Sequence, residues 1–311
     1  MNNLVETKNI FIFEGIGSKY RSIIRTLDKS ILELLNKYYK IIIDQLGVDL
    51  QEYIYEDTTN NALSDNDNTF LEWILIFTCD CIIYKSYLAN NIKPKMLVGY
   101  SMGLITAMVC TGSISFNDGL RVLERIYKYP KESKRDNEAM ATIIGLNYKS
   151  IVEIIEDLEF EELLEISSEN AEYCIGVSGV KNAINKILMV AEEQGALKTI
   201  KLDVPFAFHS KFALKGIETV KDLINNLEVG KATIPIMSVY TQNIIVNEEE
   251  LRNELLTNLY NSMEWKKTIY KLGNMGIDNF VEVSLSDSLS KMSRENAINS
   301  KFITFKDVFN N

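Results

Sequence analysis

The sequence is poor in the residue types that build metal sites and nucleic-acid surfaces. Its 311 residues include one histidine and four cysteines, and no C-x-x-C pair occurs. We therefore expect no metal site and no bound cofactor. The formal net charge of −10 and the lack of an aromatic-basic stripe argue against a nucleic-acid partner. The cysteines are predicted to be buried thiols; they are Cys79, Cys81, Cys110 and Cys174.

Long apolar runs are also missing. Charged residues interrupt every apolar stretch before it could cross a bilayer, and the N-terminus has no basic segment followed by an apolar one. We therefore expect a cytoplasmic protein with no membrane partner. A hydrophobic content of 46% is ordinary for a globular chain, and 311 residues suffice for one large domain with a smaller insert.

Nucleotide-binding motifs are absent as well. A buried strand is predicted at residues 10–13, and the turn GIGSK follows it. Position 20 is tyrosine where a dinucleotide fingerprint has its third glycine, and the chain has no G-x-x-x-x-G-K-[ST] motif. A nucleotide site is thus not supported.

The pattern of apolar residues predicts an α/β chain in two parts. Helices are expected at residues 20–40 and 71–89, and again at 214–227 and 265–272, with a strand at 233–241. Between them lie a strand, a helix, two strands, a helix and a strand, the order of a ferredoxin-like unit. We predict a large α/β-hydrolase-like domain with a parallel sheet (residues 1–136 and 206–311) and an inserted ferredoxin-like α+β subdomain (residues 137–205).

The pentapeptide GYSMG, residues 99–103, lies between a short apolar segment and a run of helix formers. Glycines on both sides of Ser101 would let the chain turn sharply and present the hydroxyl at a helix N-terminus. The backbone N–H of Met102 would then point to where an oxyanion forms. An ordinary buried turn serine fits the same pattern, so the motif alone leaves both interpretations open.

A serine nucleophile needs a base, and His209 is the only histidine. The alternative is a histidine packed among Phe206, Phe208 and Phe212. Its location favours the catalytic interpretation, because it follows the predicted insert in a proline-containing loop, where a rigid scaffold often carries catalytic residues.

Several segments together resemble the malonyl-CoA:acyl carrier protein transacylase family. FIFEGIGSKY is similar to the opening F-x-F-P-G-Q-G-S-Q, and VGYSMGLITAMVCTGSIS to the G-H-S-x-G-E elbow with its A-L-x-x-A-G-x-x-S continuation. MATIIGL resembles the first strand of the family's small subdomain, and VPFAFHS its H-A-F-H-S loop. IPIMSVYT and LYNSMEW resemble its C-terminal segments. These matches are collinear over nearly the whole chain.

The resemblance implies a discrete acyltransferase of fatty acid or polyketide biosynthesis, malonyl being the family's usual acyl group. Ser101 would take the acyl group from a CoA or phosphopantetheine thioester, with His209 as base and acid, oriented by a backbone carbonyl. The N–H groups of Ile16 and Met102 would form the oxyanion hole. The acyl group would then pass to an acyl carrier protein. Acyl-CoA and the carrier protein are the expected partners of a monomer.

The sequence departs from this family at several positions. Ile16 replaces a glutamine, Tyr100 a histidine and Leu104 a glutamate, and SLSDS replaces a Gly-Pro-Gly turn. Tyr100 is expected to line the substrate site. Asn170 falls on a family asparagine near the pocket, and a plain turn residue is an equal alternative.

The departure with the largest consequence concerns the arginine that holds the malonyl carboxylate in the family. Counting forward from Ser101 places this position on Ile126, whereas counting backward from the next strand places it on Arg125. We favour Ile126, because a one-residue deletion inside a helix would rotate the rest by about 100°. An isoleucine cannot neutralise a buried carboxylate, so the pocket is predicted to suit an uncharged acyl group, with Phe208 as a wall.

Two alternatives remain at this point. Loss of the arginine would also suit an acyl carrier protein hydrolase, and a non-catalytic carrier-binding protein is a third interpretation. In each case an acidic carrier protein would need a local basic patch on this acidic chain. We predict that the patch lies near the cleft beside the insert and includes Lys128, Lys131, Lys134, Arg135, Lys211 and Lys215.

Overall fold

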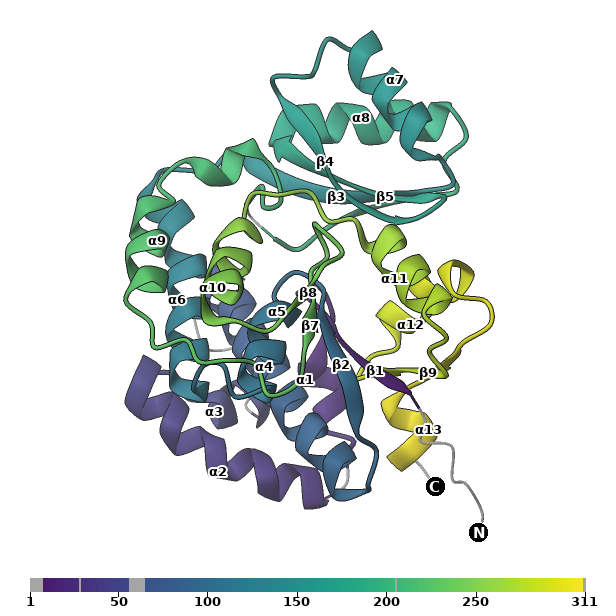
Figure 1. Ribbon diagram of the computed structural model, residues 1–311. Helices are drawn as coiled ribbons and strands as arrows, with labels where there is room; N and C mark the ends of the chain where they lie inside the picture. Colours follow the sequence, from purple (N-terminus) through teal and green to yellow (C-terminus); the bar gives the residue numbers. More distant parts are fainter. Residues whose placement is uncertain (1–7, 28, 56–64, 205, 310–311) are drawn as a thin grey trace.

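The computed structural model describes residues 8–27, 29–55, 65–204 and 206–309 (Figure 1). The larger of its two sheets has the strand order β10-β9-β1-β2-β7-β8. The predicted parallel pairing is confirmed for five strands, whereas the edge strand β8 runs antiparallel to β7. The strands are β1 (Asn9–Phe13), β2 (Pro94–Gly99), β7 (Ile236–Met237), β8 (Ile244–Ile245), β9 (Asn279–Glu282) and β10 (Lys301–Ile303).

Alternating side chains of β1 supply two separate cores, as expected for a strand covered on both faces. Phe11 and Phe13 belong to the larger core, and Ile10 and Ile12 to the smaller one. The larger core packs against α1 (Tyr20–Ile24), α2 (Lys29–Leu46), α3 (Leu50–Tyr55), α4 (Asp65–Ala89), α5 (Gly103–Cys110), α6 (Phe116–Glu132), α9 (Glu218–Asn225), α10 (Glu248–Thr257) and α13 (Phe305–Phe309). The smaller packs against α11 (Trp265–Asn274) and α12 (Ser288–Ser293).

The second sheet is antiparallel, with the strand order β4-β5-β3-β6 (Figure 1, top). Its elements follow the predicted order along the chain: β3 (Glu138–Ile144), α7 (Tyr148–Asp157), β4 (Leu164–Ala171), β5 (Cys174–Val180), α8 (Lys181–Glu193) and β6 (Lys198–Lys201). The fold class inferred from the sequence is therefore confirmed. The limits of the two domains stay predictions, and residue 205, at one limit, lies outside the described residues.

The two faces of β3 explain how this small sheet reaches the rest of the molecule. Ala139, Ala141 and Ile143 point into the core under α7 and α8. Met140 and Thr142 point the other way, into a cavity shared with the larger unit. The second face of the small sheet therefore forms one wall of the candidate site.

Three segments differ from the sequence-based predictions. The helix expected at 20–40 is two helices, since α1 ends at Ile24 and α2 begins at Lys29. The helix expected at 214–227 is a 3-10 turn, η1 (Lys211–Leu214), followed by α9, because Gly216 between them has a left-handed φ of 79°. The strand expected at 233–241 retains only Ile236–Met237 as β7.

Composition led to expectations about the cysteines, membrane spans and metal sites, and the structure describes each of these features. Cys79 and Cys81 are buried, Cys110 and Cys174 are partly buried, and all four are free. Within the ranges that the structure describes, no helix is long and apolar enough to cross a membrane. In the same ranges no three His, Cys, Asp or Glu side chains are grouped so that they could hold a metal ion.

Candidate active site

Ser101 lies at a sharp turn between β2 and α5. Its φ is 55°, in the left-handed region that non-glycine residues seldom occupy. A Cβ built at Gly99 would lie 2.2 Å from the nitrogen of Leu104, and one at Gly103 would lie 2.3 Å from the carbonyl oxygen of Phe13. Both motif positions therefore require glycine, since the backbone passes too close for any side chain. The strand, turn and helix context that the pentapeptide needs is present.

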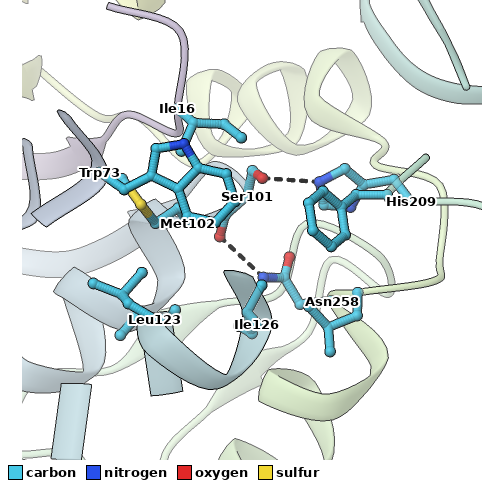
Figure 2. A pocket seen from close by; sticks show the side chains of 11 residues that line it. Ile16, Trp73, Ser101, Met102, Leu123, Ile126, His209 and Asn258 are labelled. Carbon is cyan, nitrogen blue, oxygen red and sulfur yellow. Dashed lines mark hydrogen bonds between the residues drawn. The ribbon is translucent and has the colours of Figure 1, made fainter. Parts of the chain in front are cut away.

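The predicted contact between Ser101 and the only histidine is also present. The Oγ of Ser101 lies 2.8 Å from the Nε2 of His209, as Figure 2 shows. His209 has a φ of 57°, so both members of the pair occupy the left-handed region. The backbone N–H of His209 donates to the carbonyl of Leu259 at 2.8 Å, which fixes the loop that carries the imidazole. Each side chain is thus held in a strained backbone position, as is common at functional sites.

Burial controls the protonation of the imidazole. His209 is 3% exposed, and its burial lowers the pKa of the ring to about 4, while main-chain groups of Asn258 and Asn261 act in the opposite direction. The ring is therefore neutral near pH 7. A neutral imidazole that receives the Ser101 proton at Nε2 carries its own proton on Nδ1, the tautomer that general-base catalysis requires.

Asn258, the residue after α10, contacts the backbone of Ser101. The sequence pattern did not predict a role for this residue. Its side-chain Nδ2 donates to the carbonyl oxygen of Ser101 at 3.0 Å (Figure 2). The hydroxyl of Tyr240 donates to the Asn258 side-chain oxygen, which orients the amide so that its nitrogen faces Ser101. The residue after α10 thus holds the backbone of the serine turn.

Beside Ser101 lies an apolar cavity, which we name the acyl compartment. It holds about 350 Å³ of empty space, part of it open to solvent. Ser101, His209 and Asn258 stand at one end, and no charged side chain is among the described residues that line the rest (Figure 2). The remaining lining residues are Ile16, Trp73, Met102, Ile105, Leu123, Ile126, Phe208 and Leu259.

The structure separates the two candidates for the acyl-binding position on α6. Ile126 is 7% exposed and lines the acyl compartment, one helical turn from Leu123. Arg125 lies in a different surface hollow, beside Arg121 and Lys128, and forms an ion pair with Glu132. The helical phase that favours Ile126 therefore agrees with the geometry, and Arg125 does not line the acyl compartment.

A second cavity, which we name the junction compartment, lies between the larger unit and the small sheet. It holds about 420 Å³ of empty space and shares Ile16, Ser101, Phe208 and His209 with the acyl compartment. Several of the other residues that line it carry hydroxyl groups. These other lining residues are Tyr100, Met140, Thr142, Ser167, Ser168, Gly176, Leu202, Val204 and Met263. Ser101 and His209 thus stand where the two compartments meet.

The other predicted site residues occupy different positions relative to these cavities. Ile16 and Met102 both line the acyl compartment beside Ser101, as the proposed oxyanion donors must. Tyr100 lines the junction compartment, and its hydroxyl donates to the Asn170 side chain at 3.0 Å. Asn170 itself lines neither compartment and lies behind Tyr100. Its position therefore suits support of Tyr100 rather than contact with a substrate.

The expected basic patch is largely neutralised by neighbouring groups. Arg135 is 2% exposed and forms an ion pair with Glu138 at 2.7 Å, so its assignment to a docking surface is wrong. Lys128 pairs with Glu124, and Lys211 pairs with two glutamates of the small unit. The Lys131 ammonium lies over the ring of Tyr127. Lys134 and Lys215 remain exposed.

Comparisons with known proteins identify the relatives of the chain. No family model matches the sequence. The malonyl CoA-acyl carrier protein transacylase of Bacillus subtilis is 23% identical over 292 residues, which is 93% of this chain and 90% of that protein. The structure of the corresponding transacylase (FabD) from Coxiella burnetii superposes with a TM-score of 0.82 at 21% identity and covers 96% of this chain and 93% of its own.

A third relative was solved together with its partner. The structure of a type II PKS acyl-carrier protein in complex with its malonyl-transacylase (PlMCAT:AntF) matches with a TM-score of 0.83 at 19% identity. It covers 98% of this chain and 100% of its own. The chain has the fold of the malonyl-CoA:acyl carrier protein transacylases. The resemblance to these transacylases inferred from the sequence is therefore confirmed.

Proposed function

We propose that this protein is an acyltransferase that moves an uncharged acyl group from a thioester to an acyl carrier protein through an acyl-Ser101 intermediate. The observation that carries the proposal is the 2.8 Å contact between Ser101 and His209 at the meeting point of an apolar and a more polar compartment. The similarity to malonyl-CoA:acyl carrier protein transacylases supports the same reaction class.

The first half-reaction acylates the serine. The Ser101 hydroxyl attacks the thioester carbonyl as its proton passes to Nε2 of His209. The carbonyl oxygen becomes an oxyanion, for which the backbone N–H groups of Ile16 and Met102 are the proposed donors. The intermediate then expels the thiolate, which takes the proton from His209. The acyl ester on Ser101 remains, and the ring is neutral again.

The second half-reaction is the reverse, with a different thiol. The phosphopantetheine thiol of a carrier protein gives its proton to His209 and attacks the acyl ester, and Ser101 recovers its proton when it leaves. Both thioester arms would lie in the junction compartment, whose hydroxyl groups can bond to amides. The acyl group would stay in the acyl compartment while one arm replaces the other.

The lining of the acyl compartment indicates an uncharged acyl group. Ile16 and Ile126 face the cavity, and no charged side chain lines it among the described residues. A malonyl carboxylate enclosed there without a cation would cost several kcal/mol, on the order expected for a buried unpaired ion. A short, neutral acyl group such as acetyl loses no such energy and buries apolar surface.

The partner follows from the relatives. A transacylase with the same fold was solved in complex with the acyl carrier protein of a type II PKS. We therefore propose an acyl carrier protein as the acceptor, and a place for the reaction in polyketide or fatty acid assembly.

A second candidate function is hydrolysis of acyl carrier protein thioesters. The apolar acyl compartment favours it, because a hydrolase that removes neutral acyl groups has no use for a carboxylate-binding cation. Water would then replace the carrier thiol in the second half-reaction. The two candidates differ in the fate of acyl-Ser101.

Intact-protein mass spectrometry tests these alternatives. Wild type and Ser101→Ala are incubated with acetyl-CoA, malonyl-CoA or a longer acyl-pantetheine, and a holo carrier protein is then added. We expect an acetyl adduct on wild type only, little malonyl adduct, and transfer to the carrier. Decay to free acid faster than transfer would establish the hydrolase. An absence of any adduct would refute both candidates.

A further inference from the structure

A buried carboxylate lies next to the proposed oxyanion loop. Glu14 is 4% exposed, directly follows β1 and accepts four hydrogen bonds from hydroxyl groups. No lysine or arginine pairs with it among the described residues. The donors are Ser18 at 2.6 Å, Tyr20 at 2.5 Å, Ser284 at 2.7 Å and Ser286 at 2.7 Å. Such complete satisfaction of a buried charge by neutral donors indicates a specific structural task.

These hydroxyls come from two loops that are far apart in the sequence. Ser18 lies between β1 and α1 and Tyr20 is the first residue of α1, whereas Ser284 and Ser286 belong to the segment between β9 and α12. The strands β1 and β9 pair in parallel, so both segments leave the same edge of the sheet. The Glu14 carboxylate therefore ties the ends of two neighbouring strands together.

The backbone at Glu14 and Gly15 packs against the serine turn. A Cβ built at Gly15 would lie 3.0 Å from the Cβ of Ser101, so the backbone that follows Glu14 runs against the nucleophile. A Cβ at Gly103 would lie 2.7 Å from the carbonyl oxygen of Glu14. Little free space separates this segment from the turn. A shift of Glu14 must therefore move Ile16 relative to Ser101.

A second carboxyl group in the cluster serves as a comparison. Asp80, on α4, lies 2.7 Å from the hydroxyl of Tyr20, which already has Glu14 as an acceptor. Tyr20 has one proton to donate, so a neutral Asp80 carboxyl that donates to the Tyr20 oxygen would leave this proton for Glu14. Burial raises the pKa of Asp80 well above its usual range, which agrees with a neutral carboxyl. Among the described residues, the side chain of Asp80 is hydrogen-bonded to Tyr20 only.

We propose that Glu14 is a positioning residue, which holds the backbone N–H of Ile16 in place to meet the oxyanion formed on attack by Ser101. The inference rests on the proposed acyl-Ser101 chemistry. It assigns Glu14 a role in the rate of acylation at saturating thioester. Binding of the thioester arm does not depend on it, because Glu14 lines neither compartment.

Three substitutions test the role of Glu14. Glu14→Gln keeps the shape but replaces one acceptor oxygen by a donor and removes the charge, so the hydroxyl groups that donate to that oxygen can no longer do so. Ser286→Ala removes a single donor from the opposite loop and serves if Glu14→Gln does not fold. Asp80→Asn is the matched control, since a neutral amide replaces a neutral carboxyl on the same tyrosine.

Acylation is measured per competent active site, counted by titration with a fluorophosphonate that labels Ser101. For Glu14→Gln we expect a rate at saturating acetyl-CoA that is about tenfold to a hundredfold lower, with KM changed less than about twofold. Ser286→Ala should show a smaller loss in the same direction. Asp80→Asn should retain the wild-type rate. In the double variant of Glu14 and Ser286, the second substitution should have little additional effect.

A boronic acid that forms a tetrahedral adduct with Ser101 provides a second readout. Its affinity should fall in Glu14→Gln in parallel with the rate. An unchanged or faster rate in Glu14→Gln, or an equal loss in Asp80→Asn, would overturn the inference. If wild type forms no acyl-Ser101, the proposed function fails instead. The boronic acid affinities still test the role of Glu14 in that case. Equal affinities in wild type and Glu14→Gln would overturn this role.

Discussion

The side-chain amide of Asn258 donates a hydrogen bond to the carbonyl oxygen of Ser101, over 3.0 Å and 157 residues of sequence. The same carbonyl accepts the N–H of Leu104 at the start of α5. The carbonyl of the neighbouring Leu259 accepts the backbone N–H of His209 at 2.8 Å. The segment at the end of α10 therefore supports both Ser101 and His209.

Substitution of Asn258 should therefore reduce the rate more than the affinity. Asn258→Ala removes the contact with Ser101 and is expected to slow acylation about tenfold, since small misplacement of a reacting group is costly. Asn258→Asp places an acceptor against a carbonyl and should slow it further. The single-turnover acylation rate checks both. Asn247→Ala, which removes the N-cap of the same helix, is the control: it should cost about 1 kcal/mol of stability and leave the rate unchanged.

Ile126→Arg should shift the acyl preference towards malonyl. A guanidinium at this position can reach into the acyl compartment and pair with a carboxylate, so the malonyl to acetyl ratio of acylation rates should rise at least about tenfold. Arg125→Ala is the matched control on the same helix, and it should leave the ratio unchanged. A loss of malonyl loading in Arg125→Ala would show that Arg125 serves the site after all.

The pH dependence of acylation should reflect the burial of His209. Since the pKa of His209 is lowered to about 4, the ring stays neutral as pH falls from 8 to about 5. The acylation kcat/KM should remain level over this range and decline only as pH approaches 4, where the ring gains a proton. Rates with acetyl-CoA from pH 4 to 8 provide the measurement. A midpoint near 6.5 would indicate an imidazole exposed to water.

Carrier docking should depend on the lysines that remain exposed. Lys134 follows α6 and Lys215 follows η1, and the two segments touch where Gly216 lies against Ser133. The double substitution of Lys134 and Lys215 by glutamate should slow transfer to the carrier several-fold at low salt and leave acylation by acetyl-CoA unchanged. The double substitution of Lys149 on the outer helix α7 and Lys186 on α8 by glutamate is the charge-matched control, since both lysines are exposed on the small unit. Equal transfer rates in both variants would exclude this surface.

The parts of the site set by local sequence were predictable. The two glycines around Ser101, the single histidine and the helical phase of Ile126 each follow from spacing along the chain. These features do not depend on how distant segments pack. The contact between Ser101 and His209 also required the collinear resemblance to a known family, because 108 residues separate them.

The remaining parts depend on tertiary packing and could not be predicted. Asn258 reaches Ser101 only because α10 ends beside the serine turn. The hydroxyl partners of Glu14 lie up to 272 residues away. Arg135 occurs in a charged segment that suggests a solvated loop. Its guanidinium is nevertheless buried and donates hydrogen bonds to the Glu138 carboxylate and the Ala207 carbonyl. Neither periodicity nor composition carries this information.

All the described residues that line the acyl compartment come from the larger unit, whereas the junction compartment draws on both. In the proposed function, the surface that selects the acyl group would therefore differ from the surface that binds the carrier arm, and the described residues shared by the two are Ser101, His209, Ile16 and Phe208. Substitutions on α4, α5 and α6 would then change the acyl group that the protein accepts, while the small sheet keeps its contacts with the carrier arm. A lineage could exchange acyl groups by such changes and keep the same carrier protein.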